Sequence, residues 1–260
     1  MQEWIVGILG GGGIFLATIF FSIQIYCDFS GYSDIAMGTA KIMGINLMKN
    51  FSSPYCSSSV KEFWSRWHIS LSTWFRDYIY IPLGGNRCNN FRHTLNLMIT
   101  FLVSGFWHGA NWTFIVWGGI HGLAQAVEHY MFLYKKRKRT LLSTISVFGF
   151  CTFAWIFFRA ENISDAIWIL QHIFDGVMYN PLMFLKNGFR VMCLGKLRLF
   201  ELGSAIVLLI AYDFANLKID VIAAIGELSA HVRWGVYYLF VILIIYMGSF
   251  GSSQFIYFQF

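Results

Sequence analysis

Charged side chains are scarce in this sequence. Only 12% of its 260 residues are Asp, Glu, Lys or Arg, whereas 57% are hydrophobic and the mean hydropathy is +0.57. A soluble domain usually carries about 25% charged residues, so this composition excludes an ordinary soluble domain and is typical of a protein surrounded by lipid. In a membrane, a chain of this length corresponds to one bundle of several spans. We therefore predict a single integral-membrane domain over residues 1–260.

Motifs of soluble chemistry are missing as well. The chain contains no Walker, Rossmann or G-x-S-x-G pattern, so a soluble hydrolase or a nucleotide enzyme has no support. Its cysteines are odd in number, far apart and without a C-x-x-C pair: Cys27, Cys56, Cys88, Cys151 and Cys193. We expect buried thiols rather than disulfides or zinc ligands, and we predict no metal site and no bound cofactor.

The apolar runs show what kind of membrane protein this is. None of them alternates with a period of two, which excludes a membrane barrel of strands. The first run also lacks the basic start of a signal peptide, so we expect it to stay in the membrane as a span. We predict an all-α, polytopic transmembrane helical bundle. The spans are expected near Trp4–Cys27, Thr94–Val127, Thr140–Phe158, Glu201–Leu217 and Trp234–Phe250.

Five basic residues follow one another at Lys135–Arg139, between two apolar runs. By the positive-inside rule, this loop is expected to face the cytoplasm. A nucleic-acid patch is the alternative for such a cluster, but its place between membrane segments disfavours that interpretation, and we predict no nucleic-acid partner. The stretch from Asp175 to Phe200 is expected to be a loop that faces water.

The run Thr94–Val127 contains no Asp, Glu, Lys or Arg over 34 residues. One straight helix of that length would measure about 50 Å, which exceeds a hydrocarbon core of about 30 Å. We therefore predict a helix that breaks within the membrane, at Ser104-Gly105 or at Gly109-Ala110-Asn111. Irregular backbone at this depth is tolerated only where protein or a water-filled cavity surrounds it, which predicts a cavity near His108.

Two further segments have helical periodicity of another kind. Between Val60 and Tyr80 the apolar residues recur every three or four positions while the charged residues fall elsewhere, which predicts one amphipathic helix. Its Trp and Tyr residues suit the membrane interface. Ile163–Phe174 is a shorter amphipathic candidate. Asp34 or Ser33 is expected to cap a new helix after the first span.

His108 is the strongest candidate for chemistry. An ionisable side chain within the membrane is costly and marks a functional site by default, and small residues flank this one in Ser104-Gly105-Phe106-Trp107-His108-Gly109. A neutral imidazole can take a proton from a hydroxyl at physiological pH, as acyl transfer requires. The alternative is a histidine that only hydrogen-bonds a neighbouring helix, and the sequence leaves both open.

The other ionisable candidates have weaker claims. His68, at the edge of the amphipathic stripe, could face a polar cavity, although an interfacial histidine that reaches water is the simpler interpretation. Three glycines surround His121 and favour a structural role in helix packing. Asp28 could orient a histidine or bind a cation. We assign no role to His93, His129, His172 and His231.

Several stretches, in this order, resemble the membrane-bound O-acyltransferase family, and specifically its alginate O-acetylation branch. They are Tyr26–Asp34, Glu62–Tyr78, Ile81–Arg87, Ser104–Thr113, Phe157–Asn162 and the terminal Phe255–Phe260. The resemblance implies that His108 is catalytic, in a tunnel that joins a cytoplasmic donor to an outward-facing acceptor. It implies a secondary role for His68. Because relatives are close to twice as long, the chain is expected to be their C-terminal part.

Taken together, these features predict a multi-pass enzyme of the bacterial cytoplasmic membrane. It is expected to transfer an acyl group, most simply acetyl, from acetyl-CoA or another acyl thioester to a hydroxyl of a cell-surface polysaccharide. The resemblance also implies an extracytoplasmic partner protein that completes the transfer, in addition to contact with membrane lipid. The alternatives are D-alanyl transfer to teichoic acid, a transporter, and a non-catalytic scaffold or fragment.

Overall fold

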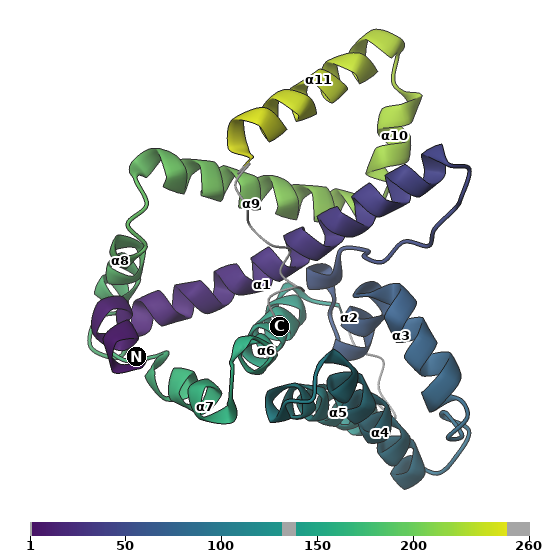
Figure 1. Cartoon of the computed structure of the whole chain (residues 1–260), viewed down its shortest axis with the longest axis vertical. Coiled ribbons are helices and arrows are strands. Elements are labelled where there is room, and N and C mark those ends of the chain that lie inside the picture. Colours follow the sequence, from purple (N-terminus) through teal and green to yellow (C-terminus); the bar gives the residue numbers. More distant parts are fainter. Residues whose placement is uncertain (1, 132–138, 249–260) are drawn as a thin grey trace. The chain divides into compact units, whose positions relative to one another are not determined.

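The computed structural model describes residues 2–131 and 139–248, and every regular element in these ranges is a helix (Figure 1). Three helical segments are long and apolar enough to cross a membrane: Gly10–Ile42, Leu141–Arg159 and Ala230–Met247. The prediction of an all-α membrane bundle is confirmed. Lys135–Lys138 of the basic loop and Phe255–Phe260 lie outside the described residues.

The chain forms two compact units, residues 1–193 and 194–260. The first holds α1 (Gln2–Ile42), η1 (Pro54–Cys56), α2 (Val60–Arg66), α3 (Ile69–Phe75), η2 (Arg76–Tyr80), α4 (Asn90–His108), α5 (Trp112–Met131), α6 (Leu141–Arg159), α7 (Ile163–His172) and α8 (Pro181–Val191). The second holds α9 (Lys196–Asn216), α10 (Val221–Glu227) and α11 (Ala230–Met247). That residues 1–260 act as one membrane domain stays a prediction.

Helix α1 is longer than the sequence predicts. It continues without interruption past Ser33 and Asp34, so the prediction that one of them caps a new helix is wrong. The physical reason is that Ser33 is buried and its hydroxyl accepts a hydrogen bond from the Asn50 amide at 3.5 Å, so it serves a tertiary contact instead. Near its start, α1 kinks at Gly10, whose φ of 57° suits glycine.

Helix α8 occupies part of the segment that was expected to be a loop. It packs against the glycine-rich start of α1, where a Cβ at Gly12 would overlap the carbonyl oxygen of Phe184. Gly188 of α8 meets the backbone of Gly12 in return. The expectation of a water-facing loop from Asp175 to Phe200 is therefore wrong, because small residues on both helices allow their backbones to touch.

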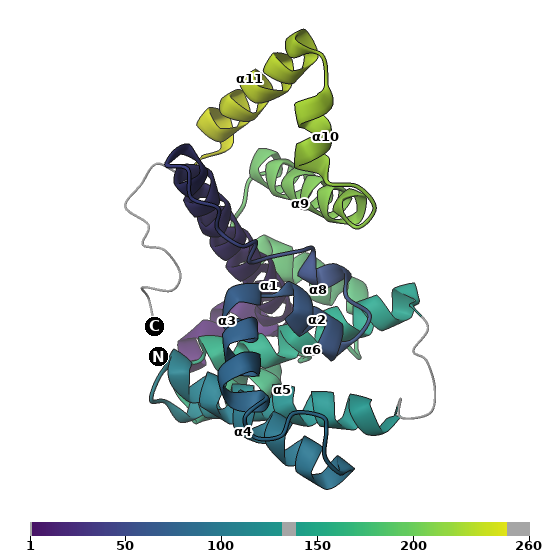
Figure 2. The ribbon, with the colours of Figure 1, turned by 90° about the vertical axis from the view of Figure 1, so that its right-hand side faces the viewer.

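Helices α4 and α5 form a tight antiparallel hairpin and lie side by side in both views (Figure 2). Helix α4 ends at His108 and α5 begins at Trp112, so the predicted break at Gly109-Ala110-Asn111 is confirmed. A Cβ at Gly105 would overlap the carbonyl oxygen of Phe114. The hairpin therefore closes at a distance that only glycine permits.

The segment from Val60 to Tyr80 departs from the predicted single amphipathic helix. It forms α2, then α3, and then the π-helical turn η2, and the first break falls at Trp67 and His68. His68 adopts the left-handed conformation, with φ 44° and ψ 54°. Residue periodicity cannot reveal this break, because tertiary contacts impose it, as the site geometry below describes. The second amphipathic prediction is confirmed by α7.

Candidate active site

His108 is the last residue of α4, at the point where the hairpin turns. Its half-buried imidazole lies among aromatic rings from three helices. The ring centroids of Trp117 and Phe158 are each 5.2 Å away and meet it edge to face, and Phe114 lies at 6.4 Å. The predicted intramembrane histidine thus stands at the end of a helix, inside an aromatic cage.

The turn after His108 is held by its own side chains. Asn111 donates from its amide to the carbonyl oxygen of Glu161 at 2.7 Å, and its carbonyl oxygen accepts from the Thr113 N–H at 3.2 Å. A Cβ at Gly109 would come within 2.6 Å of the Phe114 ring. These contacts hold the break against the residues that follow α6, and they fix the position of the adjacent His108.

His68 is the N-cap of α3, and its backbone is strained. The left-handed conformation costs a residue other than glycine about 1–2 kcal/mol. Its ring meets Phe29 of α1 edge to face at 4.7 Å, and its Nδ1 lies 3.4 Å from the Ser70 hydroxyl. Strain of this kind persists only where the surroundings enforce it, and it concentrates at functional sites.

The loop after α1 supplies that enforcement. The Asn50 carbonyl oxygen accepts from the Ile69 N–H at 3.0 Å, and the Asn50 side chain accepts from the Ser70 N–H at 3.2 Å. Ser52 donates from its backbone to the carbonyl oxygen of Arg66 at 3.0 Å. These three hydrogen bonds bind both sides of the α2–α3 turn, which explains why a helical pattern is interrupted there.

The two predicted catalytic histidines are brought together. Although 40 positions separate them in the sequence, ring contacts link their surroundings: Trp67, next to His68, packs on Trp155, Trp155 packs on Phe158, and Phe158 packs on the His108 ring. Burial lowers the pKa of His68 to about 4. At neutral pH its imidazole is therefore uncharged and able to accept a proton or a hydrogen bond.

A cavity of about 1020 Å³ lies beside this pair, between the α2–η2 segment and the α4–α5 hairpin. Along α4 it extends from His93 to Ser104, which corresponds to roughly 16 Å of helix. Neither His108 nor His68 lines it, but Ser104 lies one turn before His108 and Ile69 follows His68. The predicted cavity near His108 is thus present one helical turn away.

A pair of histidines to which the sequence assigned no role lies at the far end of this cavity. His93 and His129 have ring centroids only 4.2 Å apart, and both line the cavity. Each lies eighteen residues from Asn111, at the centre of the break. Folding the apolar run into an antiparallel hairpin about Asn111 would have paired them, so the signal was present once the break was predicted.

His121 is fully buried in α5, in agreement with the structural role that its glycine neighbours suggest. Its Nδ1 accepts a hydrogen bond from the indole N–H of Trp64 at 3.2 Å. Trp117 lies against two of the hairpin's histidines, 5.1 Å from His121 and 5.2 Å from His108. None of the five cysteines is in a disulfide. Two are buried, whereas Cys27 and Cys193 are exposed, so the expectation of burial holds only in part.

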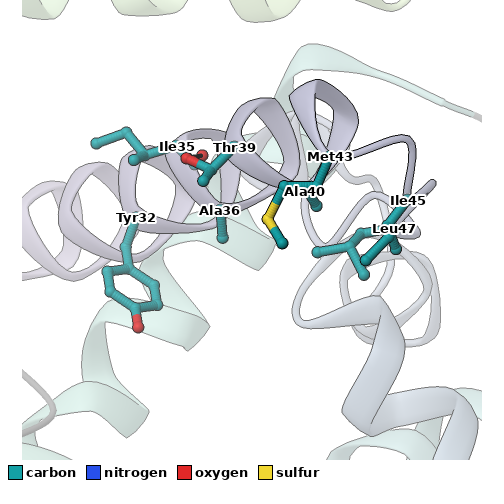
Figure 3. Close-up of a pocket in the computed structure, with 8 residues that line it drawn as sticks. All are labelled: Tyr32, Ile35, Ala36, Thr39, Ala40, Met43, Ile45 and Leu47. Atoms are coloured by element: carbon teal, nitrogen blue, oxygen red, sulfur yellow. Dashed lines mark hydrogen bonds between the residues drawn. The ribbon is translucent and has the colours of Figure 1, made fainter.

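A second recess, of about 470 Å³, lies at the C-terminal end of α1 (Figure 3). None of the residues around it carries a charge or an imidazole: Tyr32, Ile35, Ala36, Thr39, Ala40, Met43, Ile45 and Leu47. A mostly apolar surface of this kind suits contact with lipid or with another apolar chain.

The part of the chain that resembles known proteins contains the candidate site. The family model described as the membrane-bound O-acyltransferase family matches residues 12–164. This range contains α1 from Gly12 onward, the α2–α3 turn, the α4–α5 hairpin and α6. Both candidate catalytic histidines and the cavity therefore fall within the matched range.

Comparison with individual proteins gives a similar result. The chain is 48% identical over 159 residues to the protein named "Probable alginate O-acetylase AlgI" of Azotobacter vinelandii. It is 44% identical over 161 residues to a peptidoglycan O-acetyltransferase of Helicobacter pylori, and 38% identical over 145 residues to a teichoic acid D-alanyltransferase of Streptococcus thermophilus. These matches cover 60%, 60% and 51% of the chain, but only 32%, 30% and 34% of the relatives.

Proposed function

Because the chain belongs to the membrane-bound O-acyltransferase family, we propose that its protein transfers an acyl group from a thioester donor to a hydroxyl acceptor. One observation carries the proposal. His108 stands at a fixed break between two apolar helices, beside a second histidine and one helical turn from a large cavity. An imidazole in such a place suits general-base catalysis of acyl transfer.

In the proposed reaction, an imidazole nitrogen of His108 accepts the proton of the acceptor hydroxyl. The hydroxyl oxygen attacks the thioester carbonyl, a C–O bond forms, and the C–S bond breaks as the tetrahedral intermediate collapses. The proton then passes from the imidazolium to the departing thiolate sulfur. Protons and charges balance without a further reactant, and the histidine returns to its neutral state.

His68 has the second role in this proposal. Its neutral ring, held by the strained α2–α3 turn, would hydrogen-bond a reacting group and keep it in line with His108. The enforced conformation supports this role, because strained backbone held by its surroundings is concentrated at functional sites. The aromatic rings around His108 would exclude water, which limits hydrolysis of the donor.

The cavity is the proposed path of the donor. Helix α5 passes His129 at one end of the cavity and leads on to the basic loop, which the positive-inside rule assigns to the cytoplasm. A cytoplasmic thioester such as acetyl-CoA would enter at this end and extend its thioester toward Ser104 and His108. The donor is a substrate in this scheme and leaves as the free thiol.

The acceptor is proposed to be a cell-surface polysaccharide, and the acyl group to be acetyl. The alginate and peptidoglycan O-acetylating relatives support this choice, whereas the D-alanyltransferase relatives favour D-alanyl transfer as the second candidate. We also propose a multi-pass arrangement in the bacterial cytoplasmic membrane, and an extracytoplasmic partner protein that completes delivery to the polysaccharide.

The test is the O-acetyl content of the surface polysaccharide in cells that carry the full reading frame with His108→Ala. Loss of acetyl ester at matched protein level in the membrane is expected. His172→Ala is the matched control, because this histidine packs on Trp168 in α7 and should retain acetylation. Unchanged acetylation in His108→Ala would refute the proposed role of His108, and D-alanyl ester lost in its place would select the second candidate.

A further inference from the structure

His121 has no part in the proposed chemistry, yet it connects to both candidate catalytic histidines. It is completely buried, and its ring lies among aromatic rings from α2, α4, α5 and α6. Such a site would ordinarily be filled by Phe or Leu, because burial of a polar ring without full hydrogen bonding costs free energy. The presence of histidine there requires a reason.

The first connection is the hydrogen bond from the Trp64 indole to His121 Nδ1, at 3.2 Å. Trp64 lies near the end of α2, four residues before His68. Since Nδ1 accepts this hydrogen bond, the proton of the neutral ring must be on Nε2. The bond fixes the end of α2 to the middle of α5, and with it the start of the strained turn.

A second attachment fixes the other end of the same helix. The Glu128 carboxylate accepts from the Val60 N–H at 2.9 Å and from the Lys61 N–H at 3.2 Å, so it caps the N-terminus of α2. Helix α5 thus holds α2 at two points, one at each end. The Trp64–His121 bond ties the C-terminal part of α2 to α5, in addition to the hydrogen bond between Ser52 and Arg66 that holds this end to the preceding loop.

The second connection runs through Trp117, one turn before His121 on the same face of α5. The Trp117 ring is 5.1 Å from the His121 ring and 5.2 Å from the His108 ring, and both contacts are edge to face. Only 1% of Trp117 is exposed, and its indole also packs on Trp155 and Phe158. A shift of His121 is therefore transmitted to the ring that supports His108.

We propose that His121 is a positioning residue that fixes His68 and His108 relative to each other, through Trp64 on α2 and through Trp117 on α5. The inference rests on the proposed function, because it concerns the geometry of the proposed catalytic pair. In this proposal His121 acts through the two tryptophans and needs no contact with substrate. Its required feature is an acceptor at the Nδ1 position, together with the volume of the ring.

The experiment compares four variants of the full reading frame in membranes: His121→Phe, Trp64→Phe, the double variant and His121→Asn. Turnover and KM are measured with an acyl thioester donor and normalised to folded protein. His121→Phe keeps the ring but removes the acceptor, and kcat is expected to fall about ten- to a hundredfold with little change in KM, as misplaced reacting groups produce. Because Trp64 borders the cavity, a change of KM in Trp64→Phe reports on donor binding separately.

Two comparisons separate positioning from general damage to the fold. The double variant should be no slower than either single variant, because one hydrogen bond cannot be lost twice. His121→Asn, whose amide oxygen can take the place of Nδ1 but which lacks the ring that packs on Trp117, should recover part of the kcat that His121→Phe loses. His172→Phe is the matched control, since it removes another histidine that packs on a tryptophan.

Unchanged kcat per folded molecule in His121→Phe would overturn the inference, and so would single-variant effects that multiply in the double variant. Neither result would affect the proposed function as long as His108→Ala abolishes transfer. Conversely, full activity of His108→Ala would refute the proposed function itself, whatever the His121 variants do. The two failures are therefore distinguishable within one set of strains.

Discussion

The break between α4 and α5 and the turn between α2 and α3 each present one histidine, but they arise in different ways. The first break has mainly local causes, because Gly109 and Asn111 interrupt the helix and the Asn111 side chain accepts from the nearby Thr113 N–H; one distant hydrogen bond, to the Glu161 carbonyl oxygen, adds to them. The second is imposed from outside, by Asn50 and Ser52 on a segment with a helical pattern. A break with local causes can be read from a sequence, whereas one imposed by tertiary contacts cannot.

The largest effect on stability is expected where α4 and α5 cross, in the hairpin that presents His108. A Cβ at Gly118 would overlap the carbonyl oxygen of Phe101, so Gly118→Ala must push the helices apart. We expect a loss of about 2–3 kcal/mol in stability, as overpacked sites show, and loss of activity with it. Thermal unfolding of the purified protein in detergent measures the effect.

Gly149→Ala is the control for this substitution. Gly149 lies in α6 with no atom within 4 Å of an added Cβ, so alanine there should raise stability by up to about 1 kcal/mol. The two changes in unfolding temperature need not be equal in size, but Gly118→Ala must lower it and Gly149→Ala must raise it. If both variants unfold at the same temperature, the α4–α5 hairpin does not depend on close backbone contact.

The imposed turn is tested by His68→Asn. Asparagine tolerates the left-handed backbone, so stability at pH 7 should change by no more than about 1 kcal/mol. Activity should fall about a hundredfold, as the loss of a group that holds a reactant in line with His108 implies. His172→Asn should keep full activity. A fully active His68→Asn would show that the strained conformation serves packing alone.

The same variant has a pH signature. The pKa of His68 is about 4 in the folded protein, against an ordinary value of 6.5, because burial disfavours the charged ring. The unfolded chain therefore binds a proton that the folded chain does not, and this contribution to stability is lost as the pH falls from about 6.5 to 4. In His68→Asn this contribution is absent, so its unfolding temperature should depend less steeply on pH within that window.

The smallest expected effect concerns the contact between α5 and α2, which joins the two regions. Glu128 of α5 caps α2, and Glu128→Gln would remove the negative charge from a helix N-terminus and one acceptor oxygen. We expect a loss of about 1 kcal/mol. Glu201→Gln, which removes an ion pair to the exposed Arg198, should change stability by less than about 0.5 kcal/mol. Unfolding in detergent compares the two, and equal shifts would mean that packing alone holds α2.

Much of the fold was predictable because membrane composition restricts the choice to helices, and because the long uncharged run had to break at its glycines. The candidate histidines were predictable because a buried ionisable group is costly. The α2–α3 turn was not, since Asn50 lies eighteen residues before His68 in the sequence. The prediction of a cap at Ser33 was wrong for the same reason, because a hydroxyl that suits a cap serves a tertiary contact equally well.

The length of α1 has a consequence for how the protein sits in the membrane. Its apolar part, Gly10–Ile42, is 33 residues long and would measure about 50 Å, whereas the hydrocarbon core is about 30 Å thick. Such a helix meets the bilayer at a steep angle or extends beyond it, and the balance shifts when the lipid chains become longer or shorter. Because the ring of Phe29 in this helix contacts the His68 ring, we expect the thickness of the bilayer to affect the position of His68.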